Sequence, residues 1–424
     1  MLNSKYILEN KEIVINKLKS RNFDIKIVEK FFNLTKEKNL IMTQIQNLEA
    51  KKNKISSEIG IYAREKKDIS KLKNEVFEIK NEIDNLNNTF DELNLEFINL
   101  INIIPNLPSD DTPIGLSEED NKVLKTYSDI GRGLVKKQKA HYEIGLELDI
   151  LDFSRAVKIS GSRFVIFKNE GAQLLRALIS FMLDEHIKNG YEEIATQTLV
   201  LSNSLYGTGQ LPKFKDDLFK IENYDLWLIP TAEVTLTNYH NNEILNLEKP
   251  KKYTGYTKCY RSEAGSGGRD IKGLIRSHEF HKVELVKIVN EKDAEKEFSS
   301  TVKDAENILK KLEIPYRKIL LCSGDIGFSA KKTIDLELWL PSEQKFREVS
   351  SISYFGDFQA RRAKIRYKDN NKNTYAHTIN GSGIAIDRVF AAILEQYQNE
   401  DGSIEIPKVL IPYMNNKTKI EKNK

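Results

Sequence analysis

The stretch YRSEAGSGGRDIKGLIRSHEFHKVE, residues 260–284, combines residue types that could bind a phosphorylated ligand. Arg261 and Glu263 lie near its start, and Phe280 and Glu284 lie near its end. An arginine can grip a phosphate through two hydrogen bonds, an aromatic ring can stack on a base, and a carboxylate can hold an amine or a hydroxyl group. The alternative interpretation is a charged surface hairpin with a flexible tip.

Two predicted strands, 253–261 and 278–289, must position these side chains, and a glycine-rich loop, 264–273, joins them. Alternate residues of a strand lie on one face, so we expect the four side chains, and Lys282 with them, to point toward one surface. A hairpin usually turns in about two to five residues, so a longer loop needs a cause. Because glycines allow close approach to a ligand, we predict a mobile cover.

Several other kinds of site are not indicated. The sequence has no GxxxxGK[ST] loop, no strand–GxGxxG–helix unit and no GxSxG elbow. His278 and His281 are three positions apart on a predicted strand and would face opposite sides, which argues against a metal site there. Cys259 and Cys322 form neither a disulfide framework nor a zinc site. An enzyme with this sequence would work by positioning and electrostatics.

The bulk composition is that of a globular protein with two or three domains. The chain has 424 residues, 40% of them hydrophobic and 30% charged, with a net charge of +4. Its longest apolar runs fall short of the ~18 residues that a membrane span needs, and its N-terminus lacks the pattern of a signal peptide. We expect a cytoplasmic protein that does not contact a membrane.

A long helical hairpin is the strongest periodic signal. Apolar residues recur at alternating spacings of three and four, which is typical of a coiled-coil seam. A polar break, AREKKDIS at 63–70, separates two runs of similar length and predicts an antiparallel arm about 50 Å long. Lysines interrupt the first run at positions 38 and 52. The seam positions are 31, 34, 38, 41, 45, 48, 52, 55, 59 and 62, then 72, 76, 79, 83, 86, 90, 93, 97, 100 and 104.

The outer half of this predicted arm is basic. Between residues 51 and 73 lie eight Lys or Arg residues and three acids. A solvated coiled-coil surface would explain these charges, and so would an arm that binds phosphates. The candidate nucleic-acid contacts are Lys51, Lys52, Lys54, Arg64, Lys66 and Lys67.

A change of pattern near residues 103–115, IIPNLPSDDTPIG, indicates a domain boundary. Beyond it, strands that are mostly not separated by helices indicate an antiparallel sheet in an α+β domain. The predicted strands are 226–230, 253–261, 278–289, 334–340 and 345–353, and the predicted helices are 174–188 and 290–313. We expect an N-terminal domain at 1–104 with its arm at about 28–104, a linker at 105–126, a catalytic domain at 127–415 and a disordered basic tail at 416–424.

Seven segments together resemble the seryl-tRNA synthetase family, within the class II aminoacyl-tRNA synthetases, and SGSRFVIFKNEGAQL and NLPSDDTPIG are two of them. RSEAGSGGRDIKGLIRSHEFHKVE resembles the second class II motif and NGSGIAIDR, 380–388, the third. GTGQLPKF and IPTAEVTLTN resemble the serine-binding region, and REVSSISYFGDFQARR resembles the nucleotide and metal segment. The arm is similar to that family's tRNA-binding arm. The resemblance covers nearly the whole chain and implies the class II antiparallel sheet flanked by helices.

The resemblance assigns roles to individual residues. Arg261 would hold the ATP α-phosphate and Arg388 the γ-phosphate, as the catalytic pair. Phe280 would stack on adenine, with Glu263 at the adenine end and Arg276 on the phosphates. The remaining ATP contacts implied are Ser262, Glu348, Val349, Ser350 and Ser351.

The same resemblance implies a serine pocket and a metal site. Thr231, Ala232 and Glu233 would bind the amino group of serine, with Ala232 contributing backbone only; Glu284 would bind the hydroxyl group, and Ser382 would line the pocket. Glu348 and Ser351 would bind Mg²⁺, an ion that prefers oxygen ligands. The alternative for Glu233 or Glu348 is an ordinary surface carboxylate.

Three positions depart from the family pattern, and one of them is Ile352, where the family often has cysteine. The segment 384–394 is apolar except for Asp387 and Arg388, so we expect a buried helix whose buried arginine needs a partner. The family often has glycine where Asp387 stands. The first class II motif usually contains a proline, but EIATQTLVL, 193–201, has Gln197 there, which leaves the dimer geometry open.

The implied activity is the joining of L-serine to tRNA-Ser with ATP and Mg²⁺ by a homodimer, and tRNA-Sec remains open as a second substrate. Two alternatives are kept. One is a synthetase-like enzyme that aminoacylates a carrier other than tRNA. The other is a non-catalytic coiled-coil RNA-binding protein. The long arm argues against the first, and the intact charged residues of the site argue against the second.

Overall fold

The computed structural model describes residues 1–136, 138–264 and 272–422. The chain divides into two compact units, residues 2–105 and, together with Met1, the residues from Asn106 onward. Among the described residues, no helix combines the length and the apolar character that spanning a membrane requires.

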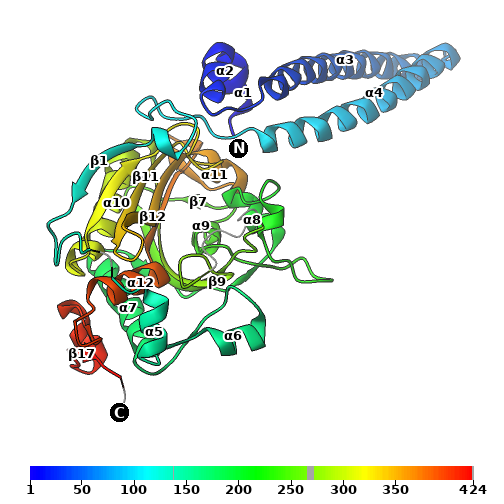
Figure 1. Ribbon diagram of the computed structural model, residues 1–424. Coiled ribbons are helices and arrows are strands. Elements are labelled where there is room, and N and C mark those ends of the chain that lie inside the picture. Colours follow the sequence, from blue (N-terminus) through cyan, green and yellow to red (C-terminus); the bar gives the residue numbers. More distant parts are fainter. Residues whose placement is uncertain (137, 265–271, 423–424) are drawn as a thin grey trace. The chain divides into compact units, whose positions relative to one another are not determined.

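The N-terminal unit consists of helices α1 (Ser4–Glu9), α2 (Lys11–Lys19), α3 (Ile25–Arg64) and α4 (Ser70–Ile103). The two long helices run antiparallel as a hairpin, drawn in blue in Figure 1. Asp24 caps α3, because its side chain accepts a hydrogen bond of 2.9 Å from the backbone N–H of Lys26. At a rise of about 1.5 Å per residue, α3 spans roughly 60 Å, so the predicted coiled-coil arm is confirmed.

The seam of the hairpin is the one that the spacing predicts. Ile41 and Ile45 of α3 are buried with Ile79 and Ile83 of α4 in one apolar cluster. Lys38 occupies a seam position without burying its charge: its ammonium donates to Asn94 Oδ1 at 2.8 Å and lies 4.0 Å from the ring centroid of Phe97. Its aliphatic stem can therefore pack in the seam while the charge stays partnered.

An eight-stranded sheet forms the centre of the second unit (Figure 1). All its neighbours pair antiparallel except β4 and β8, which are parallel. In spatial order the strands are β1 (Lys122–Tyr127), β10 (Tyr316–Leu320), β11 (Lys332–Leu340), β12 (Lys345–Gly356), β15 (His377–Ala385), β9 (Glu279–Val289), β8 (Lys251–Tyr260) and β4 (Glu192–Glu193). Four of the five predicted strands are among them, and the fifth, 226–230, is reduced to β6 (Trp227–Leu228).

Three helices pack on this sheet and close the main core: α7 (Asn169–Lys188), α10 (Ala294–Lys311) and α12 (Ile386–Gln396). Phe298 of α10 and Phe390 of α12 join Leu336 and Ile352 of the sheet in one buried cluster. The predicted helix 290–313 begins later than expected, because a short 3-10 turn follows Asn290, whose side chain accepts from the N–H of Asp293.

A second cluster lies where α9 (Glu233–Asn238) and α11 (Phe358–Ala363) meet strand β9. It contains Leu236 of α9, Ala360 of α11 and Val286 of β9. The remaining helices are α5 (His141–Glu147), α6 (Phe153–Ser160), α8 (Ser202–Thr208), and the 3-10 turns η1 (Glu118–Asp120), η2 (Lys215–Asp217), η3 (Glu291–Asp293) and η4 (Lys408–Met414). The small sheets pair β2 (Leu151–Asp152) with β3 (Ile166–Phe167), β5 (Leu199–Val200) with β6, β13 (Arg366–Asp369) with β7 (Ile244–Leu245) and β14 (Lys372–Tyr375), and β16 (Ile404–Glu405) with β17 (Lys419–Ile420).

Two expectations about chain segments are wrong. The predicted linker, 105–126, belongs to the second unit, since β1 pairs with β10 and the Asn106 amide donates to the backbone oxygens of Ser329 and Phe355. The predicted disordered tail, 416–424, is ordered as far as residue 422. Its apolar residue, Ile420, is buried in the core as part of β17.

Candidate active site

Strands β8 and β9 contain the two ends of the stretch 260–284. They pair from Lys251 with Ile288 to Tyr260 with Glu279, so the chain leaves and re-enters the sheet at neighbouring positions. The predicted mobile cover concerns the loop 264–273, and residues 265–271 of it lie outside the described residues.

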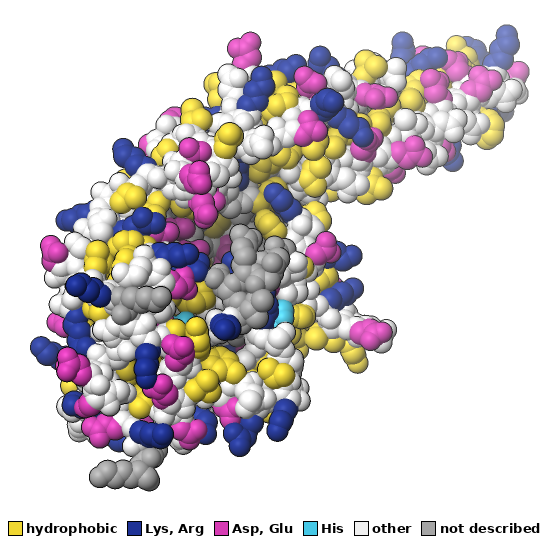
Figure 2. Space-filling view, viewed as in Figure 1, with side chains coloured by type: hydrophobic (Ala, Val, Ile, Leu, Met, Phe, Trp, Pro, Cys, Tyr) yellow, Lys and Arg dark blue, Asp and Glu magenta, His cyan; other side chains and the backbone are white. Residues whose placement is uncertain are grey.

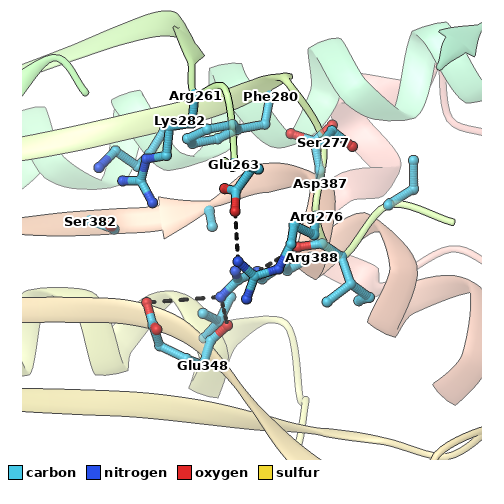
Figure 3. Close-up of a pocket in the computed structure, with 14 residues that line it drawn as sticks. Arg261, Glu263, Arg276, Ser277, Phe280, Lys282, Glu348, Ser382, Asp387 and Arg388 are labelled. Carbon is cyan, nitrogen blue, oxygen red and sulfur yellow. Dashed lines mark hydrogen bonds and ion pairs between the residues drawn. The ribbon is translucent and has the colours of Figure 1, made fainter. Parts of the chain in front are cut away.

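A pocket opens where strand β8 ends and strand β9 begins. Charged side chains of the two segments that resemble the second and third class II motifs meet there (Figure 3). It contains three arginines and one lysine against three carboxylates, which suits an anionic ligand. The lining residues are Arg261, Glu263, Leu274, Ile275, Arg276, Ser277, Phe280, Lys282, Glu348, Val349, Ser382, Ala385, Asp387 and Arg388.

Arg261 and Glu263 reach the pocket, although not as successive positions of a strand. Strand β8 ends at Tyr260, and Glu263 has a positive φ of 52°, so the strict alternation that we expected is wrong beyond residue 260. Backbone pairing continues for one residue, since the N–H of Arg261 donates to the oxygen of His278. The Arg261 guanidinium lies 5.2 Å from the ring centroid of Phe280, so the predicted phosphate and base contacts are neighbours.

Hydrogen bonds orient the two other arginines (Figure 3). Arg276 Nη1 donates to Glu263 Oε2 at 2.6 Å. Arg388 Nη1 donates to the backbone oxygen of Glu348 at 2.5 Å, and its Nε donates to the backbone oxygen of Ile275 at 3.3 Å. The three backbone and carboxylate acceptors come from three separate segments, so both guanidinium groups are held at the pocket before any ligand binds.

The buried charge of helix α12 is Asp387 rather than Arg388. Arg388 keeps 26% of its side chain exposed, whereas Asp387 is only 3% exposed as a residue. Asp387 Oδ2 accepts the backbone N–H of His281 at 2.5 Å, and Oδ1 lies 3.2 Å from His281 Nδ1. The expectation of a buried arginine is therefore wrong, because the arginine extends into the pocket. Ile384 also belongs to strand β15 and not to the helix.

A second pocket adjoins the first and shares Arg261, Glu263 and Arg276 with it. Thr231 and Glu233, both predicted to bind an amino group, line it. Thr231 Oγ1 donates to Glu284 Oε2 at 2.8 Å and accepts the N–H of Glu233 at 3.1 Å, so these three residues form one group. Ala232 between them is fully buried in the second core cluster.

Two residues of this group were missed as site residues. Lys282 is buried and its ammonium lies 2.6 Å from Glu284 Oε2. Gln359 of α11 is fully buried and donates to Glu233 Oε1 at 2.6 Å. Lys282 could have been found by its position between Phe280 and Glu284 on strand β9. Gln359 lies in the motif REVSSISYFGDFQARR, but the sequence gives no sign of its contact with Glu233, which is 126 positions away.

The electrostatics of Glu233 differ from those of an exposed carboxylate. Burial raises its pKa to about 7, and the nearby negative charge of Glu284 contributes to the rise. The hydrogen bond from Gln359 acts in the opposite direction and lowers the pKa. A cationic ligand beside this pair would favour the charged form of Glu233.

A third, wider pocket contains the predicted metal ligands, Glu348 and Ser351. The Glu348 side chain is 50% exposed and so remains accessible. Asp335 of β11 lies opposite Ser351 in the strand register, lines the same pocket and has a buried Oδ1 without a hydrogen bond to the described residues. Burial, then the charge of Glu348, raises the pKa of Asp335 well above its ordinary value.

Two predicted contacts face elsewhere. Ser262 donates from Oγ to the backbone oxygen of Asp216 at 2.7 Å. Ser350 is fully buried and donates from Oγ to the backbone oxygen of Ser382 at 2.5 Å. Both hydroxyl groups therefore donate within the protein. Val349 and Ser382 line the first pocket, as expected of ligand contacts.

The arrangement suits one kind of chemistry. A cluster of fixed cations can bind and polarise a polyphosphate, and the adjoining carboxylate pocket can hold a small ammonium compound. Because the two pockets share Arg261, a carboxylate of the second ligand could lie next to a phosphate of the first. Within the described residues, no group of three or more His, Cys, Asp or Glu side chains could hold a metal ion without other ligands.

Comparison with known proteins agrees with this chemistry. The family model for the seryl-tRNA synthetase N-terminal domain matches residues 1–108, and the model for the tRNA synthetase class II core domain (G, H, P, S and T) matches residues 215–397. The serine–tRNA ligase of Metamycoplasma arthritidis is 59% identical over 99% of this chain and 100% of that protein. The one from Listeria welshimeri is 45% identical over 99% of each chain. The crystal structure of seryl-tRNA synthetase from Pyrococcus horikoshii complexed with ATP matches with a TM-score of 0.94 and 36% identity, over 100% of both chains.

Proposed function

The chain belongs to the seryl-tRNA synthetase family, and on that basis we propose that it activates L-serine with ATP and transfers the seryl group to the 3' end of tRNA-Ser. The observation that carries this proposal is the pair of adjoining pockets that share Arg261. The first has four cationic side chains against three carboxylates, and the second has three carboxylates against two arginines, so each suits one of the two small substrates.

ATP would occupy the cationic pocket. Arg261 would bind the α-phosphate, and Arg388 the γ-phosphate, because both guanidinium groups line the pocket and arginine binds phosphate through paired donors. The ring of Phe280 would stack on adenine, with Glu263 at the adenine end and Arg276 on the phosphates. The cation–π contact between Arg261 and Phe280 supports placing the base beside the α-phosphate.

Serine would occupy the carboxylate pocket. Its ammonium group would bind Glu233 and Thr231, and its hydroxyl group would bind Glu284. A site built to hydrogen-bond a hydroxyl group strongly rejects analogues without one. Ser382, which lines the first pocket, would contribute to the wall between the two substrates.

The residues of the third pocket fit a magnesium ion that binds together with ATP. Glu348 offers an exposed carboxylate and Ser351 a hydroxyl group, an oxygen-only set that suits a hard cation. Mg²⁺ usually takes few protein ligands and completes its shell with phosphates and water. When bound, the ion neutralises phosphate charge in the reaction.

The chemical step needs alignment more than a general base. The serine carboxylate attacks the α-phosphorus of ATP, a new P–O bond forms, and the bond to pyrophosphate breaks, which gives seryl-adenylate. Arg261 and Arg388 would stabilise the charge that develops on the phosphates. The seryl group then passes to a terminal ribose hydroxyl of tRNA, and AMP leaves.

The helical hairpin would bind the tRNA. Lys54, Arg64 and Lys66 are exposed near the turn between α3 and α4, and Lys and Arg side chains stand out along this hairpin in Figure 2. Lys51 and Lys67 form ion pairs with Glu75 and Glu65, so their charges are partly compensated. The contact would be with the phosphate backbone and hence weaken with salt. By family, the active form would be a cytoplasmic homodimer.

Aminoacylation tests this proposal directly. Purified protein, ATP, Mg²⁺ and labelled serine should charge a tRNA-Ser transcript and leave a tRNA-Ala transcript uncharged. Charging of a protein carrier in place of tRNA would favour a synthetase-like enzyme that aminoacylates a carrier other than tRNA. Binding of tRNA without any charging would favour a non-catalytic RNA-binding protein.

A further inference from the structure

His141 connects the ATP pocket to the core through three buried hydrogen bonds. It is the first residue of α5 and is only 2% exposed. Its Nε2 accepts the backbone N–H of Leu274 at 3.0 Å. Its Nδ1 lies 2.7 Å from Glu395 Oε1, and its own backbone N–H donates to the same oxygen at 3.0 Å.

These contacts determine where the imidazole proton lies. The backbone N–H of Leu274 is a donor, so Nε2 must be unprotonated and the ring proton must be on Nδ1. Glu395 accepts that proton's hydrogen bond and is fully buried. It also accepts the N–H and the hydroxyl group of Ser342, at 2.7 and 2.9 Å, so it acts as a carboxylate with four donors. The ring is therefore a neutral imidazole in one tautomer.

The backbone next to Leu274, at Gly273, approaches the imidazole of His141 closely. Gly273 has a φ of +79°, and a Cβ atom at this position would lie 2.1 Å from His141 Nε2. Only glycine satisfies both the left-handed backbone and this close approach. The backbone at Gly273 thus passes close to the Nε2 edge of the His141 ring.

The same short segment carries Arg276, one of the three arginines of the pocket. Leu274, Ile275 and Arg276 all line the ATP pocket. Helix α12 holds this segment at two successive residues: Arg388 donates to the backbone oxygen of Ile275, and Glu395 reaches the N–H of Leu274 through His141. Figure 3 shows Arg276 and Arg388 side by side at this place.

We propose that His141 is a positioning residue for ATP binding: as the neutral Nδ1–H tautomer held by Glu395, it fixes residues 274–276 and thereby Arg276 and its neighbour Arg388. The link to ATP rests on the proposed function, whereas the tautomer does not. A purely structural role would predict that loss of the imidazole lowers stability and affects both substrates equally.

Two substitutions of similar polarity separate these roles. In His141→Gln, the longer side chain can still present an acceptor to the N–H of Leu274. In His141→Asn, the side chain can reach Glu395 but not Leu274. We expect His141→Asn to raise KM for ATP at least tenfold in serine-dependent ATP–pyrophosphate exchange, with KM for serine changed less than twofold. His141→Gln should stay within threefold of the wild type.

The control is His240, which also bridges two partners, Glu243 and Tyr253, but does not line the ATP pocket. His240→Asn should leave KM for ATP unchanged. Equal KM values for ATP in the two folded His141 variants, or equal rises for ATP and serine, would overturn the proposal.

Nitrogen-15 spectra of histidine-labelled wild-type protein test the tautomer without any assay of activity. The His141 signal, identified by its loss in His141→Gln, should show a protonated Nδ1 and an unprotonated Nε2 at pH 7.5. A proton on Nε2 would contradict the proposal even if His141→Asn failed to fold. If the wild type lacks serine-dependent exchange while this tautomer is observed, the proposed function fails and the hydrogen-bond assignment stands.

Discussion

Gln359 and Glu233 lie 126 positions apart in the sequence and are joined by a hydrogen bond of 2.6 Å from the amide of Gln359 to Glu233 Oε1. The same amide donates to the backbone oxygen of Thr208, and the Gln359 carbonyl accepts from the hydroxyl group of Thr378. Gln359 is therefore fixed on three sides. It presents a donor to a carboxylate whose pKa is raised to about 7 by burial and by Glu284.

The pKa of Glu233 predicts how serine binding depends on pH. Above pH 7 the group is a carboxylate and can pair with the ammonium of serine, and below pH 7 it becomes protonated and neutral. The value of kcat/KM for serine should therefore decrease as the pH is lowered, by about tenfold for each pH unit below the pKa of Glu233. Initial rates of ATP–pyrophosphate exchange between pH 6 and 8.5 measure this. A flat profile in the wild type would contradict the role of Glu233.

Removal of the Gln359 amide should weaken serine binding specifically. Gln359→Met keeps the length of the side chain but deletes its hydrogen bonds, and a hydrogen bond to a charged group is worth about 1.5–3 kcal/mol. We expect KM for serine to rise about ten- to hundredfold and KM for ATP to stay constant. Gln396→Met is the matched control, since Gln396 is buried and donates to a backbone oxygen of Trp339 outside both pockets. Parallel rises of both KM values in Gln359→Met would show only general damage.

Substitution of Arg261 should affect the chemical step. Arg261→Lys keeps the charge but loses the paired donors, and the two residues are not equivalent at a phosphate. Loss of one donor to developing charge typically costs about a hundredfold in kcat, and we expect a loss of that size in exchange. Arg155→Lys changes an exposed side chain that pairs with Asp152 and lines neither pocket, so it should show wild-type rates. An Arg261→Lys enzyme with unchanged kcat would exclude the proposed contact to the α-phosphate.

Glu348 should set the requirement for magnesium. Glu348→Gln removes one negative charge from the oxygen ligands, so the Mg²⁺ concentration for half-maximal exchange should rise at least about tenfold. Binding of Mn²⁺ in the presence of a non-hydrolysable ATP analogue, followed by electron paramagnetic resonance, gives a second readout. Glu147→Gln, which loses an exposed ion pair with Lys139 outside the pocket, is the control. Unchanged metal dependence would mean that Glu348 is not a ligand.

The exposed basic residues of the hairpin should matter for tRNA alone. Replacing Lys54, Arg64 and Lys66 by glutamine should raise KM for tRNA-Ser about tenfold or more and reduce its dependence on salt. Serine-dependent exchange, which needs no tRNA, should not change. The charge-matched control replaces three exposed lysines of the second unit, Lys296, Lys368 and Lys372. Equal loss of charging and exchange would exclude a tRNA-specific role for the hairpin.

Local periodicity made the helical hairpin and the long strands predictable from the sequence. The seam of α3 and α4 depends on spacings of three and four residues, so Ile41, Ile45, Ile79 and Ile83 could be placed before the structure was known. The match to known synthetases confirms the expected class II fold of the second unit. Long motifs also identified several residues that line the pockets, including Arg261, Glu233 and Arg388.

Features that depend on contacts distant in sequence were not predictable. The exposure of Arg388 and the burial of Asp387 follow from the contact with His281, more than 100 positions away. His141 lies outside the recognised motifs, and nothing in the motif that contains Gln359 indicates its contact with Glu233, 126 positions away. The burial of Ile420 in β17 was not predictable either. A single apolar residue in a basic tail gives no periodic signal.

Serine-dependent ATP–pyrophosphate exchange tests the central claim most directly, because it requires both pockets and neither tRNA nor the hairpin. With each of the twenty amino acids offered separately, we predict rapid exchange with L-serine and far slower exchange with alanine, glycine and threonine. Arg261→Lys should suppress the serine signal. Absence of exchange with serine, or faster exchange with another amino acid, would contradict the assignment of the two pockets.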